Sequence, residues 1–151
     1  MKFSHVNPDG TARMVDVSHK PAVKRTASAF GRVLLNPKTM QLIRENQIQK
    51  GDVLAVAKIA GIMGAKETAS LIPLCHNIEI EQIDLEFAFS DNSLDITSNA
   101  VCTDKTGIEM EALTAVSIAA LTIYDMCKAV DKTIRLTDIH LLKKTKRKLP
   151  G

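Results

Sequence analysis

Asp125 and Lys128 are the pair of residues best suited to acid–base chemistry in this sequence. They lie three positions apart in a segment with a helical pattern, so their side chains share one face of the helix. A carboxylate beside an ammonium group can be tuned into a proton acceptor and a proton donor. The same spacing also occurs in ordinary surface ion pairs, which contribute little. As a catalytic couple, Asp125 would act as base or orienting group, and Lys128 as proton donor or as an electrophile toward phosphate.

Lys50 stands directly before Gly51-Asp52, where a helix is expected to begin. The free backbone N–H groups at a helix N-terminus attract anions, and a flexible ammonium group adds to that attraction. A lysine in this position is more often simply solvated, but the combination suits a phosphorylated ligand. We therefore take Lys50 as the third candidate catalytic residue, as an acid or as a stabiliser of a departing anionic group.

Cys75-His76 follows Pro73 in a connection between a helix and a strand, which is the kind of ordered loop that often carries a site. Adjacent Cys and His side chains cannot readily close on one metal ion, and the sequence offers no second cluster at ligand spacing. No metal site is therefore predicted. His76 is interpreted as a hydrogen-bonding group for a ligand or as a structural histidine, and Cys75 as a small packing residue rather than a nucleophile.

Glu109 and Glu111 open a long predicted helix, where carboxylates complement the helix dipole. That explanation is sufficient for one of the two residues. A carboxylate is also a good acceptor for the adjacent N–H donors at the edge of a guanine-like ring. One of these residues is therefore a candidate for contact with such a ring.

These residues must be positioned by helices and strands that the apolar pattern predicts. Residues 21–35 alternate as a strand, with Val23, Ala27, Ala29, Val33 and Leu35 on one side. Asn36-Pro37 starts a short helix to about residue 46. A second helix follows Gly51-Asp52, and its predicted buried face consists of Val53, Val56, Ala57, Ala60 and Met63.

A hairpin follows, because Ile83, Leu85, Phe87 and Phe89 alternate with polar residues before the turn residues 90–93 and a return strand over 94–104. A long helix over about 109–130 and a last strand over 134–142 complete the chain. Without the short helix the order is β-α-β-β-α-β. This order predicts an α+β ferredoxin-like sandwich, an antiparallel sheet with helices on one face.

The 151 residues fit one domain, 1–151, and the 45% hydrophobic content is enough for a core. Five of the basic residues lie within 143–148, so the net charge of +3 describes a basic segment, 143–151, that is expected to be a flexible tail. Three cysteines without a C-x-x-C pair argue against disulfides and favour a reducing, cytoplasmic location. The first ten residues show no apolar signal region.

Five stretches carry a resemblance to a known family: KGDVLA from Lys50, IAGIM from Ile59, LIPLCH from Leu71, TGIEMEALTA from Thr106 and ALTIYDMCKAV from Ala120. In order and spacing they resemble the cyclic pyranopterin monophosphate synthases, the C proteins of molybdenum cofactor biosynthesis. The match begins at Met14 and reaches the last strand. Asn77 departs from the family, where Pro is frequent, and the basic segment lacks the family's Gly-Lys-Ser character.

The resemblance implies a lyase that converts 3′,8-cyclo-7,8-dihydro-GTP to cyclic pyranopterin monophosphate with release of pyrophosphate. It also implies a homohexamer, a trimer of dimers, with active sites at subunit interfaces. No tightly bound cofactor is expected, and Mg²⁺ is an optional companion of the substrate triphosphate. The implied catalytic residues are Asp125, Lys128 and Lys50, and the implied substrate-binding residues are Leu74, Cys75, His76, Met110, Glu111, Arg25 and Lys66.

Two alternatives stay open from the residues alone. A protein with the same groups could bind a GTP derivative as a sensor without converting it. An RNA-binding module of the same fold would need aromatic residues on the open face of the sheet, but aromatics are only 3% of the chain and Phe87 and Phe89 belong to the core-facing set. Membrane and nucleic-acid partners are therefore not expected.

Overall fold

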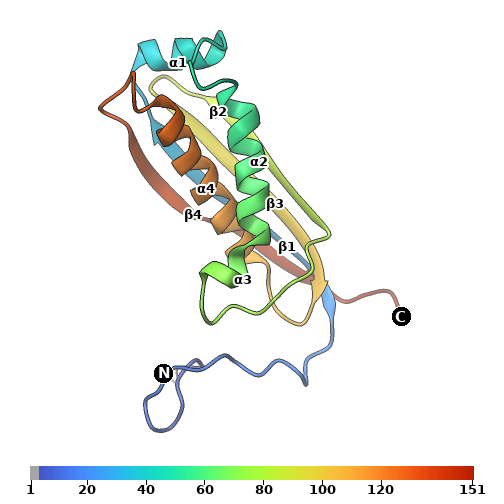
Figure 1. The fold of residues 1–151 in the computed structure, drawn as a ribbon. Coiled ribbons are helices and arrows are strands. Elements are labelled where there is room, and N and C mark those ends of the chain that lie inside the picture. The colour runs from blue at the N-terminus through green and yellow to red at the C-terminus, as the bar shows by residue number, and fades with distance from the viewer. Residues whose placement is uncertain (1–3) are drawn as a thin grey trace.

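The computed structural model describes residues 4–151, so of the predicted domain 1–151 the first three residues lie outside the described part. Figure 1 shows a curved sheet with two long helices packed along it. The predicted element order is confirmed, with one additional short helix, α3. The elements are β1 (Val23–Leu34), α1 (Pro37–Arg44), α2 (Val53–Lys66), α3 (Thr68–Leu71), β2 (Gln82–Phe89), β3 (Ser93–Asp104), α4 (Glu109–Cys127) and β4 (Arg135–Arg147).

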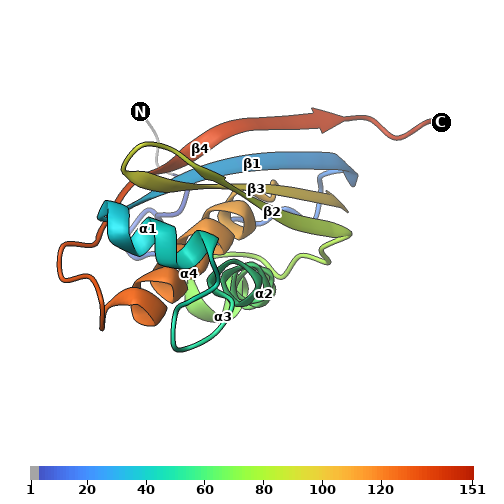
Figure 2. The ribbon, with the colours of Figure 1, turned by 90° about the horizontal axis from the view of Figure 1, so that it is seen from above.

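The four strands form one antiparallel sheet in the order β2-β3-β1-β4. Figure 2 shows α2 and α4 together on one face of this sheet, while the other face is open. The two long helices run in opposite directions, because α2 follows β1 and α4 follows β3, and these two strands are antiparallel (Figure 1). The predicted α+β ferredoxin-like sandwich is confirmed.

The alternation predicted for β1 is confirmed by burial. Ala27, Ala29, Val33 and Leu35 are at most 4% exposed, and Val23 is half-buried at the start of the strand. The hairpin residues also face the core, with Leu85 fully buried and Phe87 and Phe89 packed against the core. The core therefore fills the space between the sheet and the two long helices.

Side chains cap the first two helices at the predicted positions. Asn36 accepts a hydrogen bond from the Thr39 backbone N–H, and Pro37 occupies the first turn of α1. Asp52 accepts from the Ala55 backbone N–H and so fixes the start of α2. Each cap satisfies a donor that would otherwise lack an intrahelical partner.

The buried face of α2 was predicted partly wrongly. Val53 and Ala57 are buried, but Val56 and Met63 are 44% and 60% exposed, and the inward face continues through glycines instead. At Gly61 an added Cβ would lie 2.5 Å from Leu85 and 2.9 Å from the Ala115 carbonyl oxygen. The close approach of α2 to β2 and α4 therefore selects small residues, and larger apolar residues remain on the outer face.

The inward face of α4 is lined with small residues. Ala112, Ala115 and Ala119 are all completely buried, so this stripe serves close packing inside one subunit. By length and composition α4 could cross a membrane, but half of that stretch is buried inside the protein. Such burial is typical of the core helix of a globular domain.

The end of the last strand was predicted too early. Strand β4 continues beyond Leu142 to Arg147, and Lys144 and Lys146 lie opposite Ala27 and Arg25 of β1. The prediction of a flexible tail was therefore wrong for residues 143–147. The backbone of β1 offers hydrogen-bonding groups along its whole length, and the lysine side chains reach solvent from the edge of the sheet.

Candidate active site

The three predicted catalytic residues meet at one end of the helix pair. The Lys50 ammonium group donates to Asp125 Oδ2 at 2.9 Å and to the Asp125 carbonyl oxygen at 3.1 Å. Lys128 Nζ lies 2.8 Å from Asp125 Oδ1. The carboxylate is thus bracketed by two ammonium groups, and about half of each of the three side chains is accessible to solvent. We name this group the Lys–Asp–Lys cluster.

Local structure explains why these side chains meet. Lys50 lies in the turn between α1 and α2, where Gly51 has a φ of +114°, a conformation that favours glycine. Asp125 is in the last turn of α4, and Lys128 is the C-cap residue of the same helix. Because α2 begins where the antiparallel α4 ends, Lys50 and Asp125 are in contact although they lie 75 positions apart in the sequence.

A buried carboxylate holds the chain around this cluster. Asp131 is only 2% exposed and accepts hydrogen bonds from the Asn36 and Thr133 backbone N–H groups and from the Thr133 hydroxyl. It thereby connects the turn after α4 to the start of α1. These hydrogen bonds keep the pKa of Asp131 below its usual value although burial acts in the opposite direction.

The cluster has the electrostatics of an ionised acid–base group. Hydrogen bonds from Lys128 and then Lys50 lower the pKa of Asp125 to about 2, and the paired charges act in the same direction. The hydrogen bond to Asp125, and then the charge of that carboxylate, raise the pKa of Lys128. Near neutral pH the carboxylate is therefore ionised and the cluster carries a net positive charge, which is suited to phosphate.

A cavity of about 350 Å³ lies at the other end of α4. It is lined by all five residues that were predicted from the LIPLCH and GIEMEAL stretches, namely Leu74, Cys75, His76, Met110 and Glu111. The loop after α3 supplies the first three and the opening turn of α4 supplies the other two. We call this the loop–helix cavity.

Glu111 is the most unusual residue of the loop–helix cavity. It is 3% exposed, and its Oε2 is buried without a hydrogen-bond partner among residues 4–151. Burial raises the pKa of this carboxyl group, and Glu109 and Asp104 add to the effect. A buried acceptor without a donor is costly unless a ligand supplies one. This geometry fits a contact with the N–H groups of a guanine-like ring.

The histidine and cysteine of the same loop differ in their surroundings. His76 Nε2 lies 2.7 Å from the Val15 carbonyl oxygen, so this nitrogen carries the proton and Nδ1 is left as an acceptor in the neutral ring. Burial, together with Glu111 and Glu109, raises the pKa of the Cys75 thiol. A protonated thiol is a poor nucleophile, which fits the packing role predicted for Cys75.

Arg25 lies next to this cavity rather than in it. With Lys144, Lys146 and Glu109 it lines a neighbouring cavity of about 290 Å³, and the two cavities share Gly107 and Glu109. Arg25 donates to the Lys105 carbonyl oxygen at 3.1 Å, while its buried Nε has no partner within residues 4–151. Lys66 is exposed at the end of α2 and is not brought into the loop–helix cavity.

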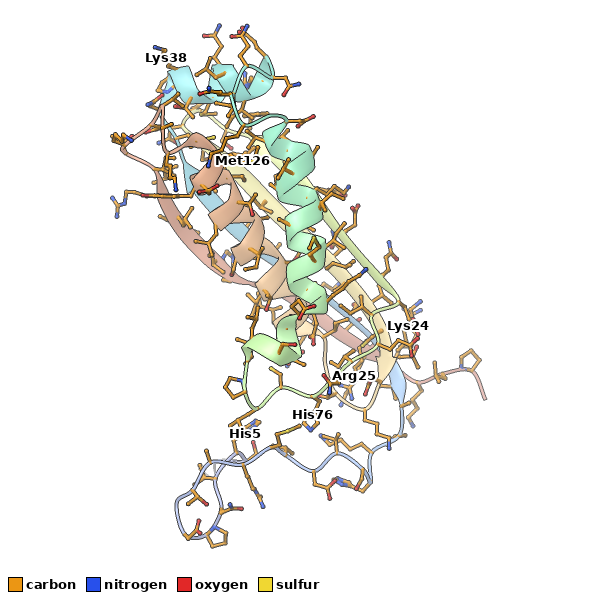
Figure 3. All side chains as sticks on the ribbon, in the orientation of Figure 1. His5, Lys24, Arg25, Lys38, His76 and Met126 are labelled. Carbon is orange, nitrogen blue, oxygen red and sulfur yellow. The ribbon has the colours of Figure 1, made fainter. Side chains whose placement is uncertain are left out.

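Sequence reasoning missed two titratable residues that line the loop–helix cavity. His5 comes from the N-terminal segment, for which no site residue was predicted, and Glu109, unlike Glu111, was not among the implied substrate-binding residues. Figure 3 shows His5, His76 and Arg25 at one end of the molecule and Met126, next to Asp125 in sequence, at the other. A contact that joins segments this distant in sequence leaves no local pattern for prediction.

Comparison with known proteins decides the family. A sequence profile described as the MoaC family matches residues 14–147. The chain belongs to the MoaC family. Cyclic pyranopterin monophosphate synthases from Peptoclostridium acidaminophilum and Syntrophomonas wolfei are 54% and 55% identical over 96% of this chain and cover 92% and 94% of their own lengths. A molybdenum cofactor biosynthesis bifunctional protein from Chlorobaculum tepidum is 52% identical over 96% of this chain and 46% of its own length.

The MoaC match includes the Lys–Asp–Lys cluster and every lining residue of the loop–helix cavity except His5, which precedes the matched range. Within residues 4–151 no three His, Cys, Asp or Glu side chains lie close enough to hold a metal ion. The two groups are separated by most of the length of α4. Glu111 and Asp125 are fourteen positions apart on this helix, which corresponds to roughly 21 Å at about 1.5 Å per residue.

Proposed function

We propose that this MoaC-family chain is a cyclic pyranopterin monophosphate synthase that converts 3′,8-cyclo-7,8-dihydro-GTP to cyclic pyranopterin monophosphate and pyrophosphate. The observation that carries the proposal is the Lys–Asp–Lys cluster in a chain more than half identical to curated synthases. A surface ion pair of this kind has little structural value, so its charge is better explained by a ligand.

The phosphate part of the reaction requires positive charge at the leaving group. To form a cyclic monophosphate from a triphosphate, an oxygen of the substrate must displace pyrophosphate at the α-phosphorus. The new P–O bond replaces the bond to pyrophosphate, which leaves with the bonding electrons, and the proton lost by the attacking hydroxyl passes to the departing pyrophosphate or to solvent. Lys50 and Lys128 are suited to stabilise this charge, and Asp125, whose low pKa makes it a weak base, is suited to orient the two ammonium groups.

The ring part of the substrate fits the loop–helix cavity. Glu111 offers a buried acceptor, and Leu74 and Met110 supply apolar walls. His76 is suited to hydrogen-bond the ring through Nδ1. Arg25, whose Nε has no partner within residues 4–151, and the exposed Lys66 are proposed to contact phosphate oxygens at the edge of the site.

A complete site in this proposal needs two subunits. One nucleotide cannot reach both groups of residues within a single chain, because they lie at opposite ends of α4. The outer face of the helix pair carries exposed apolar side chains, including Val56, Ile59 and Met63 on α2 and Leu121 and Tyr124 on α4. We propose that this face pairs subunits about a two-fold axis within a homohexamer, a trimer of dimers.

No tightly bound cofactor takes part in the proposed reaction, and Mg²⁺ would enter only with the substrate triphosphate. Elemental analysis of dialysed, active protein tests this point, and stoichiometric zinc or iron would contradict it. The proposed location is the cytoplasm, where buried thiols such as Cys102 and Cys127 remain reduced.

The test of the proposed function is direct conversion. Purified protein is incubated with 3′,8-cyclo-7,8-dihydro-GTP, and pyrophosphate and pterin are measured separately, with the Lys128→Ala variant as control. Formation of both products in equal amounts is expected for the wild type. Tight substrate binding without either product would instead indicate a nucleotide sensor. Nanomolar RNA binding with a steep salt dependence would indicate the RNA-binding alternative.

A further inference from the structure

The N-terminal hairpin, residues 4–13, has a defined structure although most of its side chains are exposed. Val6 pairs with Ala12, and the Asn7 and Arg13 backbone N–H groups donate to the Thr11 and His5 carbonyl oxygens at 2.8 and 2.9 Å. A turn at residues 7–10 closes it, with a hydrogen bond from the Gly10 backbone N–H to the Asn7 carbonyl oxygen and Gly10 at a φ of +85°. The hairpin is thus held by hydrogen bonds among its own backbone and side chains rather than by a hydrophobic core.

Two contacts hold the chain after this hairpin against the loop–helix cavity. The Val15 carbonyl oxygen is bonded to His76 Nε2 at 2.7 Å, and Lys105 Nζ donates to the Ser18 carbonyl oxygen at 3.2 Å. His76 is itself part of the cavity wall. These anchors place the N-terminal hairpin at the opening of the cavity, where His5 becomes part of the lining (Figure 3).

The lining of this cavity is poor in aromatic rings. Its apolar residues are aliphatic, and its only aromatic side chains among the described residues are His5 and His76. The His76 ring is fixed by its bond to Val15, whereas the His5 ring makes no hydrogen bond within residues 4–151. A flat heterocycle that enters the cavity therefore finds one unengaged ring, that of His5.

We propose that His5 is a further substrate-contacting residue, which stacks on the purine-derived ring while Glu111 accepts hydrogen bonds from the edge of that ring. This inference rests on the proposed function, because it assigns the ring of that substrate to the loop–helix cavity. Imidazole is a suitable stacking partner for nucleobase-like rings. The hairpin then acts as the outer wall of the binding site.

The test compares substitutions that separate stacking from hydrogen bonding. His5→Ala removes both, His5→Phe keeps the ring, and His5→Gln keeps polar atoms without a ring. Binding of 3′,8-cyclo-7,8-dihydro-GTP is measured in a Lys128→Ala background, and kcat/KM is measured in the otherwise wild-type protein. We expect His5→Ala and His5→Gln to weaken binding at least tenfold, and His5→Phe to stay within threefold of the parent.

His19→Ala is the matched control, because His19 is exposed in the same segment and does not line the cavity. Inhibition by inorganic pyrophosphate is a second control, and His5→Ala should leave it unchanged since pyrophosphate binds the Lys–Asp–Lys cluster. If the wild type converts substrate and His5→Ala remains within threefold in both binding and kcat/KM, the inference is wrong. Retention in His5→Gln but not in His5→Phe would overturn stacking. A wild type without turnover would refute the proposed function instead.

Discussion

Lys50 and Asp125 form a 2.9 Å ion pair across 75 positions of sequence, and the same lysine also donates to the Asp125 carbonyl oxygen. The Lys50 ammonium group therefore connects the turn before α2 to the last turn of α4. Exposed pairs contribute little to stability, so the value of this contact lies in where it places charge.

Replacement of either lysine of the cluster should abolish turnover and preserve the fold. Lys50→Ala and Lys128→Ala each remove a cation that the remaining lysine cannot replace, and a loss of about 3–5 kcal/mol in transition-state stabilisation is expected. Lys58→Ala is a matched control. The Lys58 side chain is about as exposed as those of Lys50 and Lys128, and its ammonium group lies 2.6 Å from Asp84 Oδ1, outside the cluster. More than about a tenth of wild-type kcat/KM in a cluster variant would remove that lysine from the catalytic residues.

The carboxyl group of Asp125 should titrate with an apparent pKa of about 2. Carbon-detected NMR of the labelled side chain measures this value. Lys128→Ala should raise the pKa further than Lys50→Ala, because the Lys128 hydrogen bond is the larger cause of the shift. A wild-type value near the usual 3.8 would show that the cluster does not form in solution.

The same shift has a consequence for stability. The folded-state pKa lies below the unfolded one, so the pairing favours the folded state at pH values above 3.8 and this contribution is lost as the pH falls toward 2. Because the group is exposed, the effect should be small. The difference in stability between wild type and Asp125→Asn should therefore shrink over this acid range in denaturant titrations.

Glu111→Gln should raise the stability of the fold and lower the activity. Burial raises the folded-state pKa of Glu111, so ionisation of this group opposes folding once the pH rises above its unfolded value. The neutral amide removes this penalty, and a gain of about 1 kcal/mol at pH 7–8 is expected, with little difference near pH 4. The kcat/KM should fall at least tenfold. A variant that is both less stable at pH 8 and fully active would contradict this account.

Shared sites between subunits can be tested by complementation. Lys128→Ala and Glu111→Ala subunits, each inactive alone, are mixed under conditions that allow subunit exchange. If the two residues serve one site from different chains, mixed dimers regain one native site and activity reappears. Absence of recovery, with exchange proven by differently tagged subunits, would rule out this pairing.

The glycines of α2 should be intolerant of a methyl group. In Gly61→Ala the new Cβ would lie 2.9 Å from the Ala115 carbonyl oxygen, which cannot move without displacing α4, so a destabilisation of about 1–3 kcal/mol is expected. Gly31→Ala is the control, since its Cβ would meet neighbours no closer than 3.5 Å. Equal unfolding midpoints for the two variants would show that the helices can separate at no cost.

Local patterns were sufficient for the fold and for the three residues of the cluster. The caps at Asn36 and Asp52 and the alternation in β1 are short-range signals, and each was found where predicted. The inner face of α2 was not predictable in this way. Its apolar residues surround the helix, and only the approach of α4 decides that Gly61 faces inward while Met63 stays outside.

Sequence analysis predicted those residues of the candidate site that belong to short, contiguous motifs. The cavity residues Leu74 to His76 and Met110 to Glu111 were found through two such motifs. His5 was not, because its place in the lining depends on the Val15–His76 contact across 61 positions. The end of β4, residues 143–147, was missed because its mostly charged sequence lacks the apolar alternation that predicts a strand, although its backbone pairs with β1.

The place of β4 in the sheet also constrains how the chain reaches its native state. Strand β1 is central and is synthesised first, yet both of its neighbours come from much later in the sequence, β3 at Ser93–Asp104 and β4 at Arg135–Arg147. Pairings between such distant segments are slow to form because a long loop must close first. The sheet cannot be completed until β4 has left the ribosome, so the edge of β1 that pairs with β4 stays open after β3 has paired with the other edge, and this open edge is the region most in need of protection from aggregation.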